Sequence, residues 1–149
     1  MDRHPVVFDD LVREVAERAA KPDVHLPLES AVVDGDQVLL AQLMQNLLEN
    51  ATTHGDPSEP VDVRTFLGPA ARPTLVVENA GPVLDQALVD TLTEPFVRAT
   101  GRTRGAAGSG LGLSVVASIA HAHGAELELT PRDGGGLRVT VTFPPSTST

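Results

Sequence analysis

Hydrophobic side chains recur at helical spacing in three long segments of the chain. Residues 8–20 place an apolar side chain every three or four positions, and residues 37–54 carry a row of leucines at the same spacing. Residues 111–123 are mostly apolar and are followed by Gly124, which favours the left-handed turn that ends a helix. The pattern therefore predicts three helices, with a shorter helix at 84–92.

Alternating hydrophobic and polar residues predict two pairs of strands. Residues 61–66 and 73–78 form the first pair, and residues 126–130 and 137–143 form the second, around a glycine-rich turn typical of a hairpin. Residues 24–33 are expected to contain two short extended pieces. Helices combined with paired strands predict a mixed α/β sheet that helices cover on one face.

The composition limits what such a domain can do. A chain of 149 residues with 41% hydrophobic and 21% charged residues suits one globular domain, expected at 1–144 with a disordered tail at 145–149. The absence of cysteine excludes disulfides, thiolate metal sites and cysteine nucleophiles. A net charge of −9 argues against binding a nucleic-acid backbone, because that requires a basic surface. No apolar run reaches the roughly 20 residues of a membrane span.

Polar residues recur every fourth position along the helix predicted at 37–54. These residues are Gln42, Asn46, Asn50 and His54. One interpretation is a solvated border of the helix, which the spacing alone allows. The other is that the amide oxygen of Asn50 binds Mg²⁺, a cation that takes one or two protein oxygens together with phosphates and water. His54, one turn later, would then reach a phosphate.

Residues 97–114 combine glycines and arginines without an acidic residue, although the protein is strongly acidic. Arg98, Arg102 and Arg104 precede a run of glycines that leads to the start of a helix. Glycine lets a backbone approach an anion closely, and the free N–H groups of a helix N-terminus bind anions. The segment predicts a mobile, phosphate-binding loop at 97–110, although it is not a P-loop.

Asn79 ends the second predicted strand. Alternation places Leu75, Val77 and Asn79 on one face of that strand and Glu78 on the other. Asn79 is either an ordinary turn residue before Gly81 or a polar side chain directed to the core side of the sheet. The strand alone leaves both interpretations open.

Four motifs in this order resemble the ATP-binding domain of sensor histidine kinases, which belongs to the GHKL superfamily together with DNA gyrase B and MutL. Residues 46–51 with His54 are similar to the N box of that family, and residues 79–82 to its first glycine box. Residues 94–98 resemble the F box, and residues 108–113 the second glycine box. The resemblance covers nearly the whole chain. It implies a Bergerat-type two-layer α/β sandwich, with a mixed five-stranded sheet covered on one face by three helices.

The resemblance also implies the site residues. Asn50 would bind Mg²⁺, and Asn79 would read the adenine of ATP, which Gly81 would allow to approach closely. Asn46, Asn50 and Arg98 are the implied catalytic residues. The implied nucleotide-binding residues are Asn46, Asn50, His54, Asn79, Gly81, Val83, Phe96, Arg98, Gly108, Ser109, Gly110, Leu111, Gly112 and Leu113.

Two positions depart from the pattern of the family. Asn79 stands where the family usually has Asp, and Val83 stands where it has a second glycine. A neutral amide lacks the charge-assisted hydrogen bond that a carboxylate forms with the adenine amino group. From the sequence we therefore expect the Asn79→Asp variant to bind ATP more tightly. Val83 is expected to alter the local backbone.

The implied function is to bind Mg-ATP and to present its γ-phosphate to a histidine on a separate dimerisation domain, which serves a response regulator. None of the five histidines has the sequence context of such an acceptor, so no autophosphorylation is expected from this chain alone. The domain is expected to be monomeric and cytoplasmic, in a membrane-anchored parent, without a nucleic-acid partner.

Two other functions remain open. An ATP-hydrolysing switch or a serine kinase of the same fold would need a glutamate where Asn46 stands. A non-catalytic protein-binding module is favoured by Asn79 and Val83, whereas Asn50 and the intact second glycine box argue against it.

Overall fold

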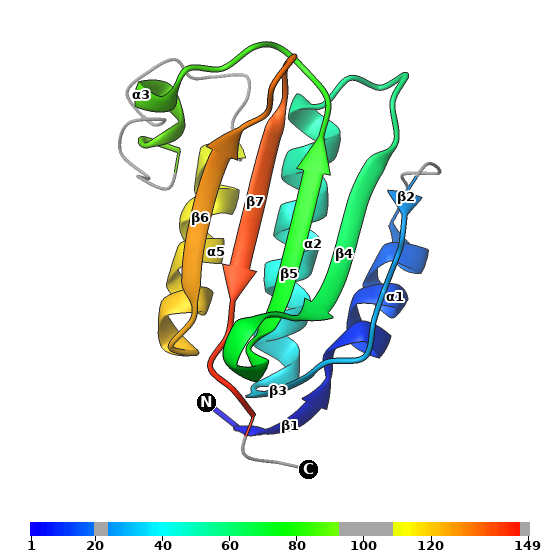
Figure 1. The fold of residues 1–149 in the computed structure, drawn as a ribbon, viewed down its shortest axis with the longest axis vertical. Coiled ribbons are helices and arrows are strands. Elements are labelled where there is room, and N and C mark those ends of the chain that lie inside the picture. Colours follow the sequence, from blue (N-terminus) through cyan, green and yellow to red (C-terminus); the bar gives the residue numbers. More distant parts are fainter. Residues whose placement is uncertain (20–23, 93–108, 147–149) are drawn as a thin grey trace.

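Three helices lie on one face of a five-stranded sheet (Figure 1). The computed structural model describes residues 1–19, 24–92 and 109–146. The sheet has the order β2-β4-β5-β7-β6, in which β2 runs parallel to β4 and every other neighbouring pair is antiparallel. The predicted mixed sheet is therefore confirmed. Its strands are Val24–His25 (β2), Val61–Leu67 (β4), Pro73–Asn79 (β5), Glu126–Pro131 (β6) and Leu137–Thr142 (β7).

The helical layer consists of α1 (Phe8–Arg18), α2 (Gln37–His54) and α5 (Ser109–Ala122). The short helix α3 (Gln86–Val89) covers only part of the range predicted for it, and the 3₁₀ turn η1 (Pro69–Ala71) joins β4 to β5. None of the described helices has the length and apolar character needed to cross a membrane.

A second, two-stranded sheet was not predicted. The strand β1 (His4–Val7) pairs antiparallel with β3 (Val32–Gly35), which places Val6 opposite Val33. Both side chains are buried, so this small sheet extends the core beyond the main sheet. Four residues that include a proline carry too little alternation to predict a strand, and β1 forms only because a distant segment of the chain, β3, meets it.

The core lies between the helices and the inner face of the sheet. Phe8 at the start of α1 meets Phe143 after β7 edge-to-face, with ring centroids 5.3 Å apart. His123, which is 2% exposed, joins the end of α5 to the start of α2. Its Nδ1 donates to the carbonyl oxygen of Ile119 at 2.8 Å, and its Nε2 accepts the N–H of Asp36 at 3.1 Å. These contacts join the starts of α1 and α2 and the end of α5 to the residue after β7, all at one end of the helical layer.

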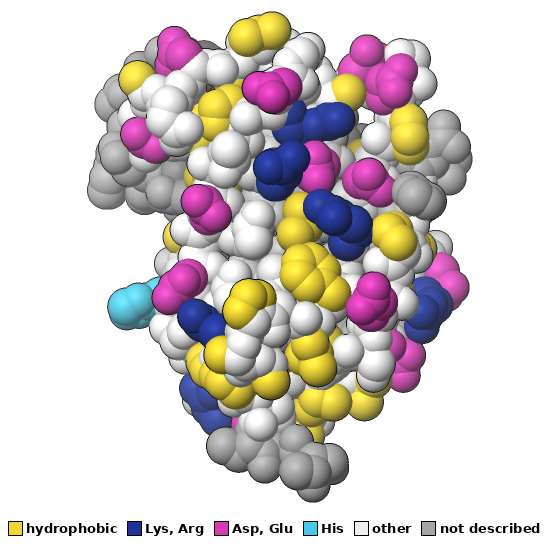
Figure 2. Space-filling view, in the orientation of Figure 1, with side chains coloured by type: hydrophobic (Ala, Val, Ile, Leu, Met, Phe, Trp, Pro, Cys, Tyr) yellow, Lys and Arg dark blue, Asp and Glu magenta, His cyan; other side chains and the backbone are white. Residues whose placement is uncertain are grey.

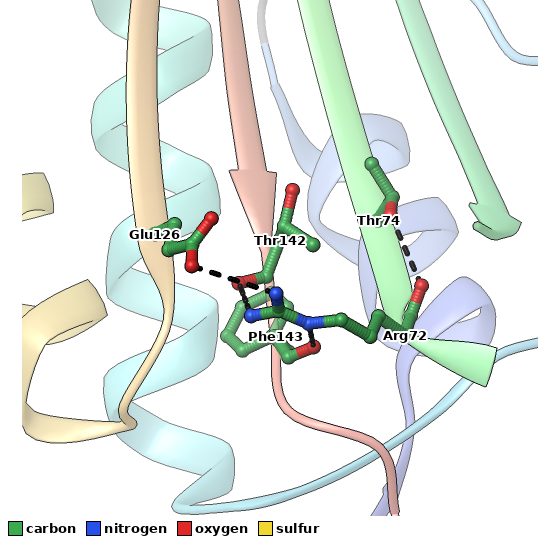
Figure 3. Close-up of polar contacts among 5 residues, drawn as sticks. All are labelled: Arg72, Thr74, Glu126, Thr142 and Phe143. Atoms are coloured by element: carbon green, nitrogen blue, oxygen red, sulfur yellow. Dashed lines mark hydrogen bonds and ion pairs between the residues drawn. The ribbon is translucent and has the colours of Figure 1, made fainter. Parts of the chain in front are cut away.

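No helix of the described residues covers the opposite face of the sheet (Figure 1). At one end of the sheet, Arg72 joins the ends of three strands (Figure 3). Its Nε donates to the carbonyl oxygen of Phe143 at 3.1 Å and its Nη2 to that of Thr142 at 3.4 Å, while its Nη1 pairs with Glu126 at 3.5 Å. Arg72 therefore ties the chain before β5 to the end of β7 and the start of β6.

The segment expected to be a disordered tail is described only at its beginning. The hydroxyl of Ser146 donates to Oδ1 of Asp34 at 3.1 Å, which holds this residue against β3. Residues 147–149 lie outside the described part of the chain.

Candidate functional site

A pocket of about 150 Å³ lies between α2, the end of β5 and α3. The amides of Asn50 and Asn79, both only 6% exposed, line it together with His54. A closed apolar cavity of about 150 Å³ takes up a benzene-sized ring, so this volume suits a flat ring system that a few polar atoms orient. The rest of the lining is mainly apolar: Pro82, Leu84, Leu88, Leu92, Gly136 and Leu137.

Asn79 takes the orientation that strand alternation predicts. Leu75, Val77 and Asn79 are buried on the inner face of β5, and Glu78 lies on the open face. The Nδ2 of Asn79 donates to the carbonyl oxygen of Ala80 at 3.1 Å. No described residue donates a hydrogen bond to the Oδ1 of Asn79. This oxygen is therefore the atom of the amide that is left for a ligand.

Asn50 is a buried amide without a hydrogen-bond partner among the described residues. Leaving a buried polar group unpaired is costly, which makes this position a candidate for a ligand that completes it. Its oxygen is of the type that Mg²⁺ takes, and no group of three acidic, His or Cys side chains in the described ranges offers a competing site. The amide oxygen of Asn50 therefore suits Mg²⁺ as its protein ligand, with oxygens of phosphate and water as the other ligands.

Gly81 brings the end of α2 close to the loop after β5. A Cβ atom at this position would lie 3.1 Å from the carbonyl oxygen of His54 and 3.6 Å from the Nδ2 of Asn79. The structure thus gathers four of the predicted residues, Asn50, His54, Asn79 and Gly81, in one place.

Two other predicted residues lie apart from this pocket. Asn46 is half-buried and lines a wide groove of about 910 Å³ along the first half of α2, together with residues of the N-terminus. Val83 is 79% exposed and does not line the pocket, whereas its two neighbours in the chain do.

The second glycine box leads directly into a helix. The helix α5 begins at Ser109, two residues before the predicted start, so most of the second glycine box, including Gly110 and Gly112, forms the first turn of this helix. Gly112 is half-buried in α5, and Leu113 packs in the core with 1% exposure. The side chains of 109–111 and all of residues 93–108 lie outside the described part, including Phe96, Arg98, Gly108 and the loop expected at 97–110.

The apolar half of the pocket was not predicted from the sequence. Leu84, Leu88 and Leu92 recur every fourth residue, a pattern that indicates one face of a helix but not what the face contacts. Gly136 and Leu137 come from the β6–β7 hairpin, which the sequence predicts, but its position against Asn79 depends on the pairing of β5 with β7.

Comparison with known proteins gives the family. Residues 35–147 match the family described as "Histidine kinase-, DNA gyrase B-, and HSP90-like ATPase". The chain belongs to this ATPase family. It is 44% identical to the sensor protein CutS of Streptomyces coelicolor over 118 residues, which cover 78% of this chain and 28% of CutS. It is 34% identical to the probable sensor histidine kinase TcrY of Mycobacterium tuberculosis over 141 residues, 90% of this chain and 30% of TcrY. The ATPase domain thus spans less than a third of these relatives.

Solved structures share the fold of this ATPase domain. The mycobacterial sensor histidine kinase MprB superposes with a TM-score of 0.81 at 23% identity, over 96% of this chain and 97% of that chain. The ATP-binding domain of PrrB from Mycobacterium tuberculosis gives 0.74 at 24% identity, over 99% of this chain and all of that chain. The predicted family and the predicted two-layer sandwich are both confirmed.

Proposed function

We propose that this ATPase domain binds Mg-ATP and presents the γ-phosphate to a histidine on a separate dimerisation domain, in two-component signalling. The observation that carries the proposal is the pair of buried amides, Asn50 and Asn79, in a ring-sized apolar pocket. Relatives that are named sensor histidine kinases, and the ATPase family itself, support it.

The polar side and the apolar side of the pocket both contribute to the recognition of adenine. The Oδ1 of Asn79 accepts a hydrogen bond from the 6-amino group of adenine, while the leucines after β5 exclude water from the ring. Guanine has an acceptor where adenine has that amino group, so the same oxygen disfavours GTP.

The other side of the pocket serves the phosphates. Asn50 would hold Mg²⁺, which would supply positive charge to neutralise phosphate oxygens. Phosphoryl transfer asks a protein mainly for positioning and charge stabilisation, which suits a site built from amides and backbone. We assign the phosphate contacts to Asn46, His54, Arg98 and the residues of the second glycine box, Gly108, Ser109, Gly110, Leu111 and Gly112.

The acceptor histidine lies outside this domain. His123 is 2% exposed with both ring nitrogens in hydrogen bonds, so it cannot receive a phosphoryl group. An imidazole on a dimerisation domain acts as its own nucleophile, which removes the need for a strong base here. A response regulator then takes the phosphoryl group, and a membrane-anchored parent keeps the domain in the cytoplasm.

Hydrolysis is not the proposed reaction. The residue one turn before Asn50 is Asn46, a neutral amide that cannot activate water as a glutamate would.

Two measurements test the proposal. Calorimetry of the 149-residue chain should show ATP binding that is tighter with Mg²⁺ than without it. Labelled ATP should then transfer its γ-phosphate to the purified dimerisation segment of the parent kinase, but not to a version with its acceptor histidine replaced by glutamine. Absence of nucleotide binding would overturn the proposal, and binding without transfer would favour a non-catalytic module.

A further inference from the structure

Three arginines surround one glutamate on the open face of the sheet. Glu78 forms ion pairs with Arg64 at 3.1 Å, with Arg132 at 3.2 Å and with Arg138 at 3.3 Å, and its side chain is only 12% exposed. Figure 2 shows Lys and Arg side chains gathered on the upper part of this face, with an acidic side chain among them. Glu78 directly precedes Asn79, which lies in the nucleotide pocket on the opposite face.

The three arginines come from structurally different places. Arg64 and Arg138 belong to β4 and β7, whose ladders with β5 already fix them. Arg132 belongs to the turn between β6 and β7, where no strand ladder holds it. Its backbone N–H donates to the carbonyl oxygen of Gly136 at 3.0 Å, and its own carbonyl accepts the N–H of Gly135 at 3.1 Å. Arg132 therefore closes the turn with its backbone and anchors it to β5 with its side chain.

The same turn forms one wall of the nucleotide pocket. The N–H of Gly136 donates to the carbonyl oxygen of Pro82 at 2.9 Å, and Gly136 and Leu137 line the pocket. A Cβ atom on Gly136 would overlap the carbonyl oxygen of Asn79, so the turn rests directly on the strand end that carries Asn79. A displacement of the turn would therefore change the shape of the pocket.

We infer that Arg132 is a positioning residue for nucleotide binding, which acts through its ion pair with Glu78 on the far side of the sheet. The pair holds the β6–β7 turn against residues 79–82 and so keeps the pocket in its binding shape. This inference rests on the proposed binding of ATP. Arg64 pairs with the same carboxylate without any link to the turn, which makes it a matched control.

The first experiment measures ATP affinity and the melting temperature for the Arg132→Gln, Arg132→Lys and Arg64→Gln variants of the 149-residue chain. Glu78 keeps two arginine partners in each variant, so all three should fold and show similar, small decreases in melting temperature. We expect Arg132→Gln to raise the Kd of Mg-ATP by about three- to tenfold, which lies within the range found for mutations along a structural network. Arg132→Lys should restore much of the affinity, and Arg64→Gln should leave the Kd unchanged.

A second experiment replaces ATP by adenosine, which carries no charge. The ion pair of Arg132 with Glu78 is partly buried, with side-chain exposures of 33% and 12%, so salt should screen it little, and adenosine binding by the unmodified chain and by Arg64→Gln should change only slightly with salt. Arg132→Gln should bind adenosine weakly at all salt concentrations.

Equal effects of Arg132→Gln and Arg64→Gln on the Kd, or no effect of either, would overturn the inference and leave the proposed function intact. A chain that binds neither ATP nor adenosine without any substitution would overturn the proposed function itself. The two failures are therefore distinguishable.

Discussion

The side-chain amide of Asn79 donates its hydrogen to the carbonyl oxygen of Ala80 at 3.1 Å. That carbonyl oxygen also accepts the backbone N–H of Asp56 at 2.8 Å, so it joins the loop after α2 to the end of β5. The hydrogen bond fixes which end of the amide faces the carbonyl. It leaves the Oδ1 for the contact that we propose with the adenine amino group, and it gives the Nδ2 a structural task that a carboxylate cannot perform.

Because of this hydrogen bond, we expect Asn79→Asp to weaken ATP binding, whereas the sequence alone led us to expect tighter binding. At neutral pH the carboxylate would place a second acceptor against the carbonyl oxygen of Ala80, in place of a donor. We expect the variant to lose about 1–3 kcal/mol of unfolding free energy and to bind ATP more weakly. Urea denaturation at neutral pH and calorimetry with Mg-ATP measure both effects.

The pH dependence of the same variant provides its control. Once protonated, the carboxyl group that Asn79→Asp introduces can donate to the carbonyl oxygen of Ala80, so the stability difference from the unmodified chain should shrink in acid. Tighter ATP binding with unchanged stability would show instead that the charged hydrogen bond to adenine outweighs the contact with Ala80.

Replacement of Asn50 separates stability from function. Asn50→Ala removes a buried amide that has no described hydrogen-bond partner, and alanine is the better helix former. We therefore expect the nucleotide-free variant to gain about 0.5 kcal/mol of unfolding free energy or more. Its ATP affinity should no longer depend on Mg²⁺, as calorimetry with and without the cation can show.

The exposed Gln45 on the same helix supplies the control for Asn50→Ala. Gln45→Ala should leave both the unfolding free energy and the Mg²⁺ dependence of ATP binding nearly unchanged. A Mg²⁺ dependence that survives in Asn50→Ala would move the cation site to other residues.

Asp36, which caps the N-terminus of α2, makes the free energy of unfolding depend on pH. The N–H groups of Asp2, Leu39 and Val38 donate to the carboxylate of Asp36 and hold its pKa below the ordinary 3.8. Because the folded pKa is lowered, this stabilisation is present above about pH 3.8 and is lost as the pH falls through the folded pKa.

Asp36→Asn tests this dependence, since asparagine also caps helices but does not titrate. We expect the unmodified chain to have the higher melting temperature near neutral pH, and the difference to shrink as the pH falls below about 3.8. Melting curves followed by circular dichroism measure it. A difference that stays constant from neutral pH into the acid range would assign the acid response to other carboxyl groups.

The sequence predicted the elements whose pattern is local. The leucines of α2 and the alternation along β5 are each readable within one segment, and they place Asn50 and Asn79 on the correct faces. Family motifs then connected these two residues to one ligand. Local periodicity was sufficient here because each side chain is oriented by its own helix or strand.

The parts that the sequence did not predict depend on contacts between distant segments. The strand β1 exists through its pairing with β3, and Leu137 reaches the pocket through its register with Asn79. Alternation assigns Glu78 to the open face, but it does not say that an arginine from the β6–β7 turn meets it there. Register and turn position are properties of the folded sheet, not of any single segment.

The glycine at the base of the β6–β7 turn touches the strand end that carries Asn79. Gly136 has a φ of +101°, and a Cβ atom there would overlap the carbonyl oxygen of Asn79. Gly136→Ala must therefore both strain its own backbone, at a cost of about 1–2 kcal/mol, and push the turn away from the strand end that carries Asn79. We expect a lower melting temperature and a Kd for Mg-ATP that is raised about tenfold or more, which corresponds to about 1.4 kcal/mol.

Gly134 in the same turn offers a matched control, because its φ is +86° and, apart from its chain neighbours, no described residue has an atom within 4 Å of the position of a Cβ. Gly134→Ala carries the backbone strain without the contact, so it should lower the melting temperature and leave the Kd unchanged. If both alanine variants weakened ATP binding equally, backbone strain anywhere in the turn would be enough to weaken binding, and the contact with Asn79 would not be the cause. If Gly136→Ala lowered only the melting temperature, the contact between the turn and Asn79 would serve the fold and not the nucleotide.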